Sequence, residues 1–101
     1  MKPLAVSSLK IGAFTYTVIL AHDLKRGDEK MDGHLEHSKS SITLDDDMDK
    51  QATTQTLLHE VVHEIAIQSG QDLSEGQVDA VAYGWIQVMR DNPELVRMIV
   101  K

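Results

Sequence analysis

Cysteine is absent from this sequence of 101 residues. Disulfide bonds and thiolate metal sites are therefore excluded, and the composition suits a reducing compartment. Long hydrophobic runs are absent as well, since no segment approaches the roughly 18 consecutive apolar residues that a transmembrane helix needs. The N-terminus also lacks the apolar stretch of a signal peptide. We therefore expect a cytoplasmic protein with no membrane partner.

Basic residues are scarce relative to acidic ones. Ten lysine and arginine residues stand against sixteen aspartate and glutamate residues, which gives a formal net charge of −6 at pH 7. The acidic residues are densest in LDDDMD, residues 44–49, and no basic stripe offsets them. A surface of this sign repels phosphate backbones, so we expect no nucleic-acid partner.

The chain is short enough for a single domain, residues 1–101, and its first half has the composition of strands and turns. Residues 9–20 are rich in β-branched and aromatic side chains, and the polar residues 22–34 contain the turn signals RGD and MDG. One or two short strands follow in residues 34–44, of which SSITL, residues 40–44, is the better candidate. This half predicts a small antiparallel sheet of about three strands.

The second half of the chain has the apolar spacing of helices. Apolar residues recur at intervals of three and four from about Asp49 to Ser69, the pattern of one helix face. Asp49 can cap the start of this helix, and Gly70 suits the position just after its end. We expect Trp85 and the methionines to fill the core.

Two further helices follow the first. The second begins within QDLSEGQ, residues 71–77, where a capping box can start from Ser74 or from Asp72. DNPEL, residues 91–95, then opens a short third helix that has Asn92 as its cap and proline at its first position. With the sheet of the first half, these helices predict an α+β fold.

Two histidines and a glutamate stand in an otherwise apolar helix, in TLLHEVVHEIAIQSG, residues 56–70. His59 and His63 are four residues apart, which places both imidazoles on one helix face, where they can hold one metal ion. Glu60 is rotated by about 100° from His59 and can lie beside the ion as the general base for a water molecule. Burying these groups without a metal or a partner would be costly. The pattern therefore predicts a zinc site of the H-E-x-x-H type.

A catalytic zinc needs a third protein ligand. Metzincins carry it as a histidine six residues after the second one, but Ser69 stands at that position here. The remaining candidates are Glu75 and Asp79, which share one face of the second helix, and we favour Glu75. The other acidic residue is expected to hold a ligand imidazole by its free N–H.

The two helices together resemble a family of small metallopeptidases. TLLHEVVHEI followed by LSEGQVDAVAYGW is similar to the minigluzincins and to the related ImmA/IrrE-type and phage-encoded enzymes, over about residues 56–92. That group carries E-x-x-A-N-x-F-A on the second helix, where this chain has EGQVDAVA. Glu75 and Ala82 match the pattern, whereas Asp79 replaces the asparagine, and valines replace the first alanine and the phenylalanine.

The resemblance implies both a fold and an activity. The fold is a minimal zincin core, in which a small sheet precedes the H-E-x-x-H helix, a second helix carries a ligand, and a short helix ends the domain. The resemblance implies a Zn²⁺ ion held by His59, His63 and Glu75, with Glu60 as the general base. The implied reaction is the hydrolysis of a peptide bond in a peptide or protein substrate.

Other residues could complete such a site. Tyr83 lies two turns after Glu75 and is either a boundary tyrosine or a group that, with Asp79, supports the ligands or the oxyanion. His34 and His37 are expected at the surface unless their strands border the site, and Glu64 is expected to face solvent. Ser40–Leu44 is either an internal strand or the sheet edge to which a substrate adds as a strand.

Three functions remain open on the sequence alone. The first is a zinc metalloendopeptidase of minimal size. The second is a zinc-stabilised binding or regulatory protein of phage or prophage origin, because so short a chain leaves no second lobe for the far wall of a cleft. A homodimer or another partner could complete that cleft. The third is an α+β domain that binds no metal.

Overall fold

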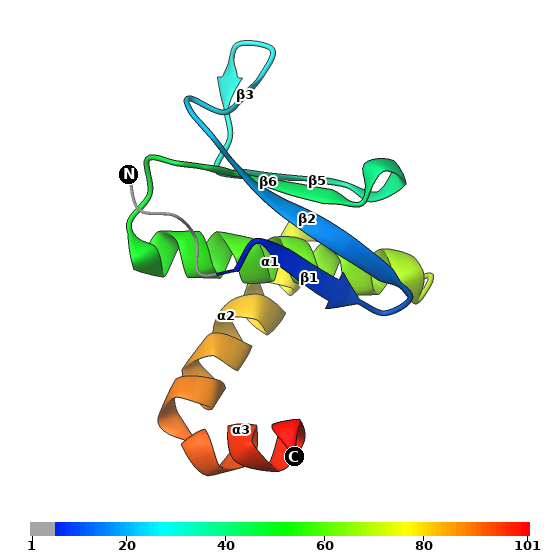
Figure 1. The fold of residues 1–101 in the computed structure, drawn as a ribbon, viewed down its shortest axis with the longest axis vertical. Coiled ribbons are helices and arrows are strands. Elements are labelled where there is room, and N and C mark those ends of the chain that lie inside the picture. Colours follow the sequence, from blue (N-terminus) through cyan, green and yellow to red (C-terminus); the bar gives the residue numbers. More distant parts are fainter. Residues whose placement is uncertain (1–5) are drawn as a thin grey trace.

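The computed structural model describes residues 6–101, in which a mixed sheet of four strands lies on one long helix (Figure 1). The strand order is β1-β2-β6-β5, with bounds Ser8–Ile11, Phe14–Ala21, Ser41–Asp45 and Gly33–Glu36. Neighbouring strands are antiparallel except β2 and β6, which are parallel. The predicted α+β class is confirmed, but the sheet has four strands and mixed direction instead of about three antiparallel strands.

The segment between β2 and β5 explains why the prediction of the sheet was wrong. Its polar residues form a separate two-stranded ribbon of β3 (Lys25–Arg26) and β4 (Glu29–Lys30), which turns at Gly27 with a φ of 63°. A short 3₁₀ helix, η1 (His37–Lys39), then turns the chain from β5 into β6. The chain returns after the ribbon, so β6 enters the sheet between β2 and β5, parallel to β2.

Helix α1 (Lys50–Gln68) has the predicted bounds. The Asp49 carboxylate accepts the N–H of Ala52 at 2.8 Å, which satisfies one of the free donors at the helix start. At the other end Gly70 has a φ of 69°, a left-handed conformation that glycine adopts without a steric penalty. The chain therefore leaves α1 in a sharp turn toward the second helix.

Helix α2 (Glu75–Asp91) begins with the capping box that starts from Ser74. Helix α3 (Pro93–Val100) follows almost at once, with proline at its start as expected. Asn92 does not cap α3 through its side chain, because its amide donates instead to the Val88 carbonyl at 2.9 Å and closes the end of α2. None of the described helices is long and apolar enough to cross a membrane.

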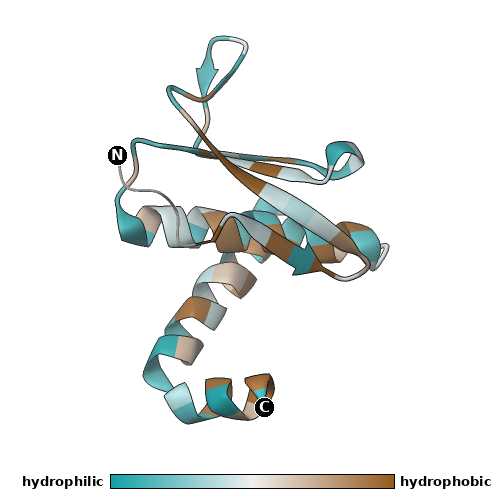
Figure 2. Ribbon diagram, in the orientation of Figure 1, coloured by the Kyte–Doolittle hydropathy of each residue, from teal (hydrophilic) through white to brown (hydrophobic). Residues whose placement is uncertain are grey.

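The core lies between the sheet and α1, and a smaller cluster joins α1 to α2. The main cluster consists of Ile11, Tyr16, Val18, Ile42, Leu44 and Leu57. The smaller cluster consists of Val62, Val78 and Ala82. The expectation that Trp85 and the methionines fill the core is wrong for Trp85 and Met98, whose exposed fractions are 46% and 76%. The reason is that α2 runs away from the sheet beyond its contact with α1, so hydrophobic residues on the last two helices stay uncovered (Figures 1 and 2).

One buried carboxylate ties the β3–β4 ribbon to the sheet. Asp45, which is 2% exposed, accepts the N–H of Leu24 at 2.8 Å and the ammonium group of Lys30 at 3.2 Å. The bond from Leu24 lowers the pKa of Asp45, and the bond from Lys30 adds to this effect, although burial opposes it. This first aspartate of DDDMD is therefore a structural anchor, whereas Asp47 and Asp49 are exposed.

We predict that Asp45→Asn lowers the midpoint of urea unfolding at neutral pH, because the amide loses the charge that the ribbon donors stabilise. The folded-state pKa of Asp45 lies below the unfolded value, so its contribution is present above the unfolded pKa and is lost as the pH falls through the folded pKa. The difference in urea midpoint between the wild type and Asp45→Asn should therefore become smaller as the pH is lowered. Asp47→Asn, at an exposed position two residues away, serves as the control and should leave the midpoint unchanged.

Candidate metal centre

Helix α1 holds the two imidazoles of the H-E-x-x-H motif side by side. The Nε2 atoms of His59 and His63 are 3.1 Å apart, and their ring centroids are 4.7 Å apart. Both side chains are partly buried, with exposed fractions of 15% and 26%. The i, i+4 spacing thus directs one nitrogen from each ring to the same point in space.

Glu75, the first residue of α2, reaches this point from the other helix. Its Oε2 atom lies 3.4 Å from His59 Nε2, and its Oε1 atom lies 2.6 Å from His63 Nε2. Glu75 lies within the capping box of α2. In this box the Ser74 hydroxyl accepts the N–H of Gln77 at 3.1 Å, and the Gln77 side chain accepts the N–H of Ser74 at 2.8 Å. The capping box therefore fixes the residue at which α2 begins.

The three side chains suit a zinc ion by donor type and by distance. One donor atom from each of His59, His63 and Glu75 lies within 4.8 Å of the other two. Zinc binds nitrogen and oxygen at about 2.0–2.2 Å, so neighbouring donors of a tetrahedral site lie roughly 3.4 Å apart. The separations given above lie close to this value, apart from the shorter His63–Glu75 contact. Two imidazoles and one carboxylate also leave a fourth position free, as catalytic zinc sites require.

Asp79 contacts the opposite side of the His59 ring. Its Oδ1 atom lies 2.7 Å from His59 Nδ1, one helical turn after Glu75. A hydrogen bond from Nδ1–H to this carboxylate fixes the tautomer that leaves the Nε2 lone pair free. Of the two acidic candidates on α2, Glu75 thus lies at the shared point of the imidazoles, and Asp79 orients one of them.

Glu60 lines a pocket together with two of the three clustered side chains, His59 and Glu75. Its side chain is only 7% exposed, and burial raises its pKa, while the neighbouring His59 and His63 oppose this shift and Glu75 adds to it. A carboxylate with a raised pKa is a stronger base than an exposed glutamate. Glu60 is therefore a buried carboxylate with a raised pKa that lines the pocket beside His59 and Glu75.

The pocket extends from these residues to the chain segment that leads into β5. Its volume is about 290 Å³, and its lining consists of Met31, Asp32, Gly33, Thr56, His59, Glu60, Glu75, Asp79 and Tyr83. Gly33 allows the close approach of this segment, since a Cβ atom there would lie 2.7 Å from Thr56 Cγ2 and 3.3 Å from Glu60 Oε2. The sequence did not predict that Met31, Asp32 and Gly33 line the pocket. The turn signal MDG was the only feature that marked these residues.

Tyr83 stands at the rim of this pocket. It is 43% exposed, and partial burial raises the pKa of its hydroxyl group, as does the nearby Asp79. The three residues Glu75, Asp79 and Tyr83 follow one another at intervals of four, so they share one face of α2. Tyr83 is thus a boundary tyrosine whose side chain also lines the pocket.

Glu64 is wrongly predicted to face solvent. It has no exposed surface, and both of its carboxylate oxygens lie 2.9 Å from His37 Nδ1. Gln68 donates to Glu64 at 2.8 Å, and the Tyr16 hydroxyl lies 3.2 Å from the same His37 nitrogen. Burial alone would raise the pKa of Glu64, but the bonds from Tyr16, His37 and Gln68 outweigh it and lower the pKa. This network joins α1 to the sheet and keeps His37 away from the candidate metal centre.

Two other predicted positions, His34 and the strand Ser40–Leu44, do not line the pocket. His34, on β5, is 36% exposed and lies near enough to Glu60 for its charge to lower the pKa of that carboxyl group. Most of the predicted strand Ser40–Leu44 lies in β6, which begins at Ser41 and pairs with a strand on each side, so it cannot serve as the open sheet edge. That edge is β5, whose first residue lines the pocket.

Comparison with known family models, curated proteins and solved structures found no match to this chain. The interpretation of the site therefore depends on the geometry of its own residues.

We predict that Asp79→Asn weakens zinc binding by about 10- to 100-fold, because an amide holds the His59 imidazole less firmly in its metal-binding tautomer. Competition with a chromogenic chelator measures the affinity. Asp72→Asn, in the exposed turn before α2, is the matched control and should bind zinc as the wild type does. Equal zinc affinities for the Asp79 variant and the control would contradict the orienting role of Asp79.

Proposed function

We propose that this chain is a small zinc-dependent metallopeptidase of the minigluzincin type that acts in the cytoplasm. One observation carries the proposal: the carboxylate of Glu75 meets the Nε2 atoms of His59 and His63, and Glu60 lines the same pocket. Two metal ligands and a base on one helix, with a carboxylate from the next helix, are the parts that zinc-dependent peptide hydrolysis requires.

Each residue of the centre has a distinct role in this proposal. His59, His63 and Glu75 hold the ion, and Asp79 orients the His59 ring. A bound zinc ion would supply a water molecule of lowered pKa and polarise the substrate carbonyl group. Glu60 accepts the proton of that water and can pass it to the leaving amine. Tyr83 is the candidate donor to the developing oxyanion, since it lines the pocket and has a neutral hydroxyl group.

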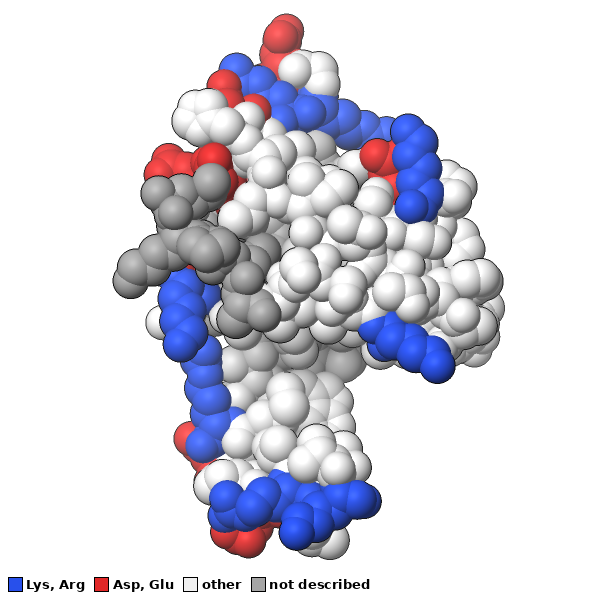
Figure 3. All heavy atoms as spheres, in the orientation of Figure 1, with Lys and Arg blue, Asp and Glu red and all other residues white. Residues whose placement is uncertain are grey.

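The charge of the pocket supports a metal and indicates a class of substrate. Four carboxylates line it, those of Asp32, Glu60, Glu75 and Asp79. Their combined field favours a divalent cation and disfavours acidic peptide side chains close to the scissile bond. Lysine and arginine side chains are dispersed at the margins of the face drawn in Figure 3, a distribution that does not favour a nucleic-acid backbone. We infer a neutral or basic peptide substrate.

The size of the pocket supports a second candidate function, a zinc-stabilised binding or regulatory protein with little turnover. A volume of about 290 Å³ is at the lower end of ligand pockets, which measure roughly 300–1,000 Å³. The residues of α1, α2 and β5 that line the pocket would contact a bound peptide on one side only. Such a protein would bind a partner at these residues and retain zinc without cleaving peptides.

Replacement of Glu60 by glutamine tests the proposed mechanism. Glu60→Gln should lower the rate of cleavage in a broad peptide library by about 10²- to 10⁴-fold, because glutamine cannot accept the proton of the water. Zinc content by elemental analysis should stay at one ion per chain, since Glu60 is not among the proposed ligands. Glu29→Gln, at an exposed position on the ribbon, is the matched control and should retain full activity.

Three results would contradict these proposals in different ways. Cleavage that survives Glu60→Gln at the wild-type rate would exclude the mechanism. A zinc-loaded wild type that cleaves nothing in the library or in a proteome-wide cleavage profile would exclude the peptidase and favour the binding protein. A wild type that holds no zinc after reconstitution would exclude both functions.

A further inference from the structure

An apolar groove runs between α1 and α2 on the side of α2 that faces away from the candidate metal centre. Its volume is about 370 Å³, and its apolar lining includes Leu58, Val61, Ile65, Val81, Trp85 and Met89. This volume is more than twice the roughly 150 Å³ that accommodates a benzene molecule. Ile65, Val81 and Trp85 are 51%, 42% and 46% exposed. Large aliphatic and aromatic side chains thus surround a space that the described residues leave open.

The groove and the metal centre use different faces of α2. Glu75, Asp79 and Tyr83 line the metal-centre pocket, whereas Val81, Trp85 and Met89 line the groove. Positions two residues apart, such as 79 and 81, point in directions about 200° apart on a helix. A molecule in the groove would therefore leave the metal centre open.

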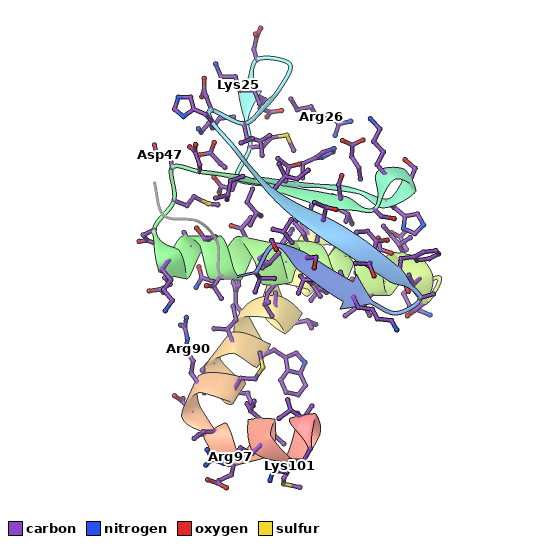
Figure 4. All side chains as sticks on the ribbon, viewed as in Figure 1. Lys25, Arg26, Asp47, Arg90, Arg97 and Lys101 are labelled. Carbon is purple, nitrogen blue, oxygen red and sulfur yellow. The ribbon has the colours of Figure 1, made fainter. Side chains whose placement is uncertain are left out.

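A second uncovered apolar surface lies on the C-terminal arm, which we define as residues 90–101. Within it, Met98, Ile99 and Val100 of α3 are 76%, 62% and 74% exposed, and no residue of α3 is buried. Figure 2 shows hydrophobic residues at this end of the chain, and Figure 4 shows Arg97 and Lys101 at the far end of the arm. One chain thus carries both an apolar groove and an uncovered apolar helix.

From these surfaces we infer that the protein forms a two-fold dimer in which the α3 helix of each copy occupies the groove of the other. Both surfaces belong to the same chain, so a two-fold axis covers all four surfaces of a pair at once. This interface goes beyond the proposed function and does not depend on zinc.

The exposed area of the chain agrees with this dimer. A compact monomer of 11.3 kDa exposes about 5,700 Å², whereas this chain exposes 6,991 Å². The excess is roughly 1,300 Å², and a standard interface buries about 800 Å² on each partner. Among the described residues, the polar β3–β4 ribbon and the apolar arm both project from the sheet and α1 in Figure 1. Burial is favourable for the arm, because its exposed surface is apolar.

The distribution of charge permits two acidic chains to associate in this way. The whole chain has a net charge of −6, but the arm has three basic and two acidic side chains: Arg90, Asp91, Glu94, Arg97 and Lys101. The arm is therefore weakly positive, and it would contact the acidic remainder of the other copy. In the dimer, the weakly positive arm of one copy would thus contact the negatively charged remainder of the other copy.

The mass of the full chain in solution, measured by size-exclusion chromatography with light scattering, tests the inference. The wild type should have twice the 11.3 kDa of one chain. Trp85→Lys in the groove and Ile99→Glu on α3 should each halve the measured mass. An equal mixture of the two variants should restore the dimer, since the intact α3 of one fits the intact groove of the other, and the second contact pairs lysine with glutamate. Val81→Lys with Met98→Glu is a second pair for the same test.

Ile19→Glu is the matched control, because Ile19 is 43% exposed on the sheet and should leave the dimer intact. Circular dichroism and zinc content, measured on each variant, separate loss of the dimer from loss of the fold or of the metal centre. A monomeric wild type at the highest soluble concentration would overturn the inference and leave the groove to another protein. Variants that stay dimeric, or a mixture that stays monomeric, would overturn it as well. Dissociation by Ile19→Glu would assign the interface to the sheet instead.

Discussion

The candidate site depends on one contact between helices, the packing of the first half of α2 against the second half of α1. The small cluster of Val62, Val78 and Ala82 holds the two helices together. The capping box at Ser74 fixes where α2 begins. Only with both in place does the Glu75 carboxylate lie against the imidazoles of His59 and His63. A shift of α2 by one residue would turn Glu75 away by about 100° and leave only two donors facing each other.

Buried carboxylates hold the rest of the scaffold in place. Glu64 links α1 to the sheet through His37 and Gln68, and Asp45 links the β3–β4 ribbon to β6 through Leu24 and Lys30. Each carboxylate accepts several hydrogen bonds, which offset the cost of removing its charge from water. Glu60 differs from both, because burial dominates the pKa of its carboxyl group and raises it. Two of these buried carboxylates thus support the scaffold through hydrogen bonds, whereas the third, Glu60, has a raised pKa and lines the pocket beside His59 and Glu75.

Helix α2 has three faces with three environments, and this division explains its unusual exposure. One face turns its carboxylates to the pocket, a second packs on α1 through Val78 and Ala82, and a third lines the apolar groove with Trp85. The small sheet packs on α1, so it does not cover the faces of α2 that line the pocket and the groove. The exposed arm follows from this constraint, because no further layer in residues 6–101 lies over it.

The sequence by itself determined the features that depend on near neighbours. The spacing of His59 and His63, the cap at Asp49 and the turn at Gly70 follow from helix geometry and backbone preference, so α1 could be predicted almost to the residue. The tertiary structure alone decided the features that depend on distant segments. It made β6 an internal strand, buried Glu64 and left Trp85 exposed, because a side chain's environment depends on which element packs over it. Glu75 and Asp79 share one face of α2, so the sequence alone could not decide which of them contacts both imidazoles. The packing of α2 against α1 decides it, because it places Glu75 at the Nε2 atoms of His59 and His63.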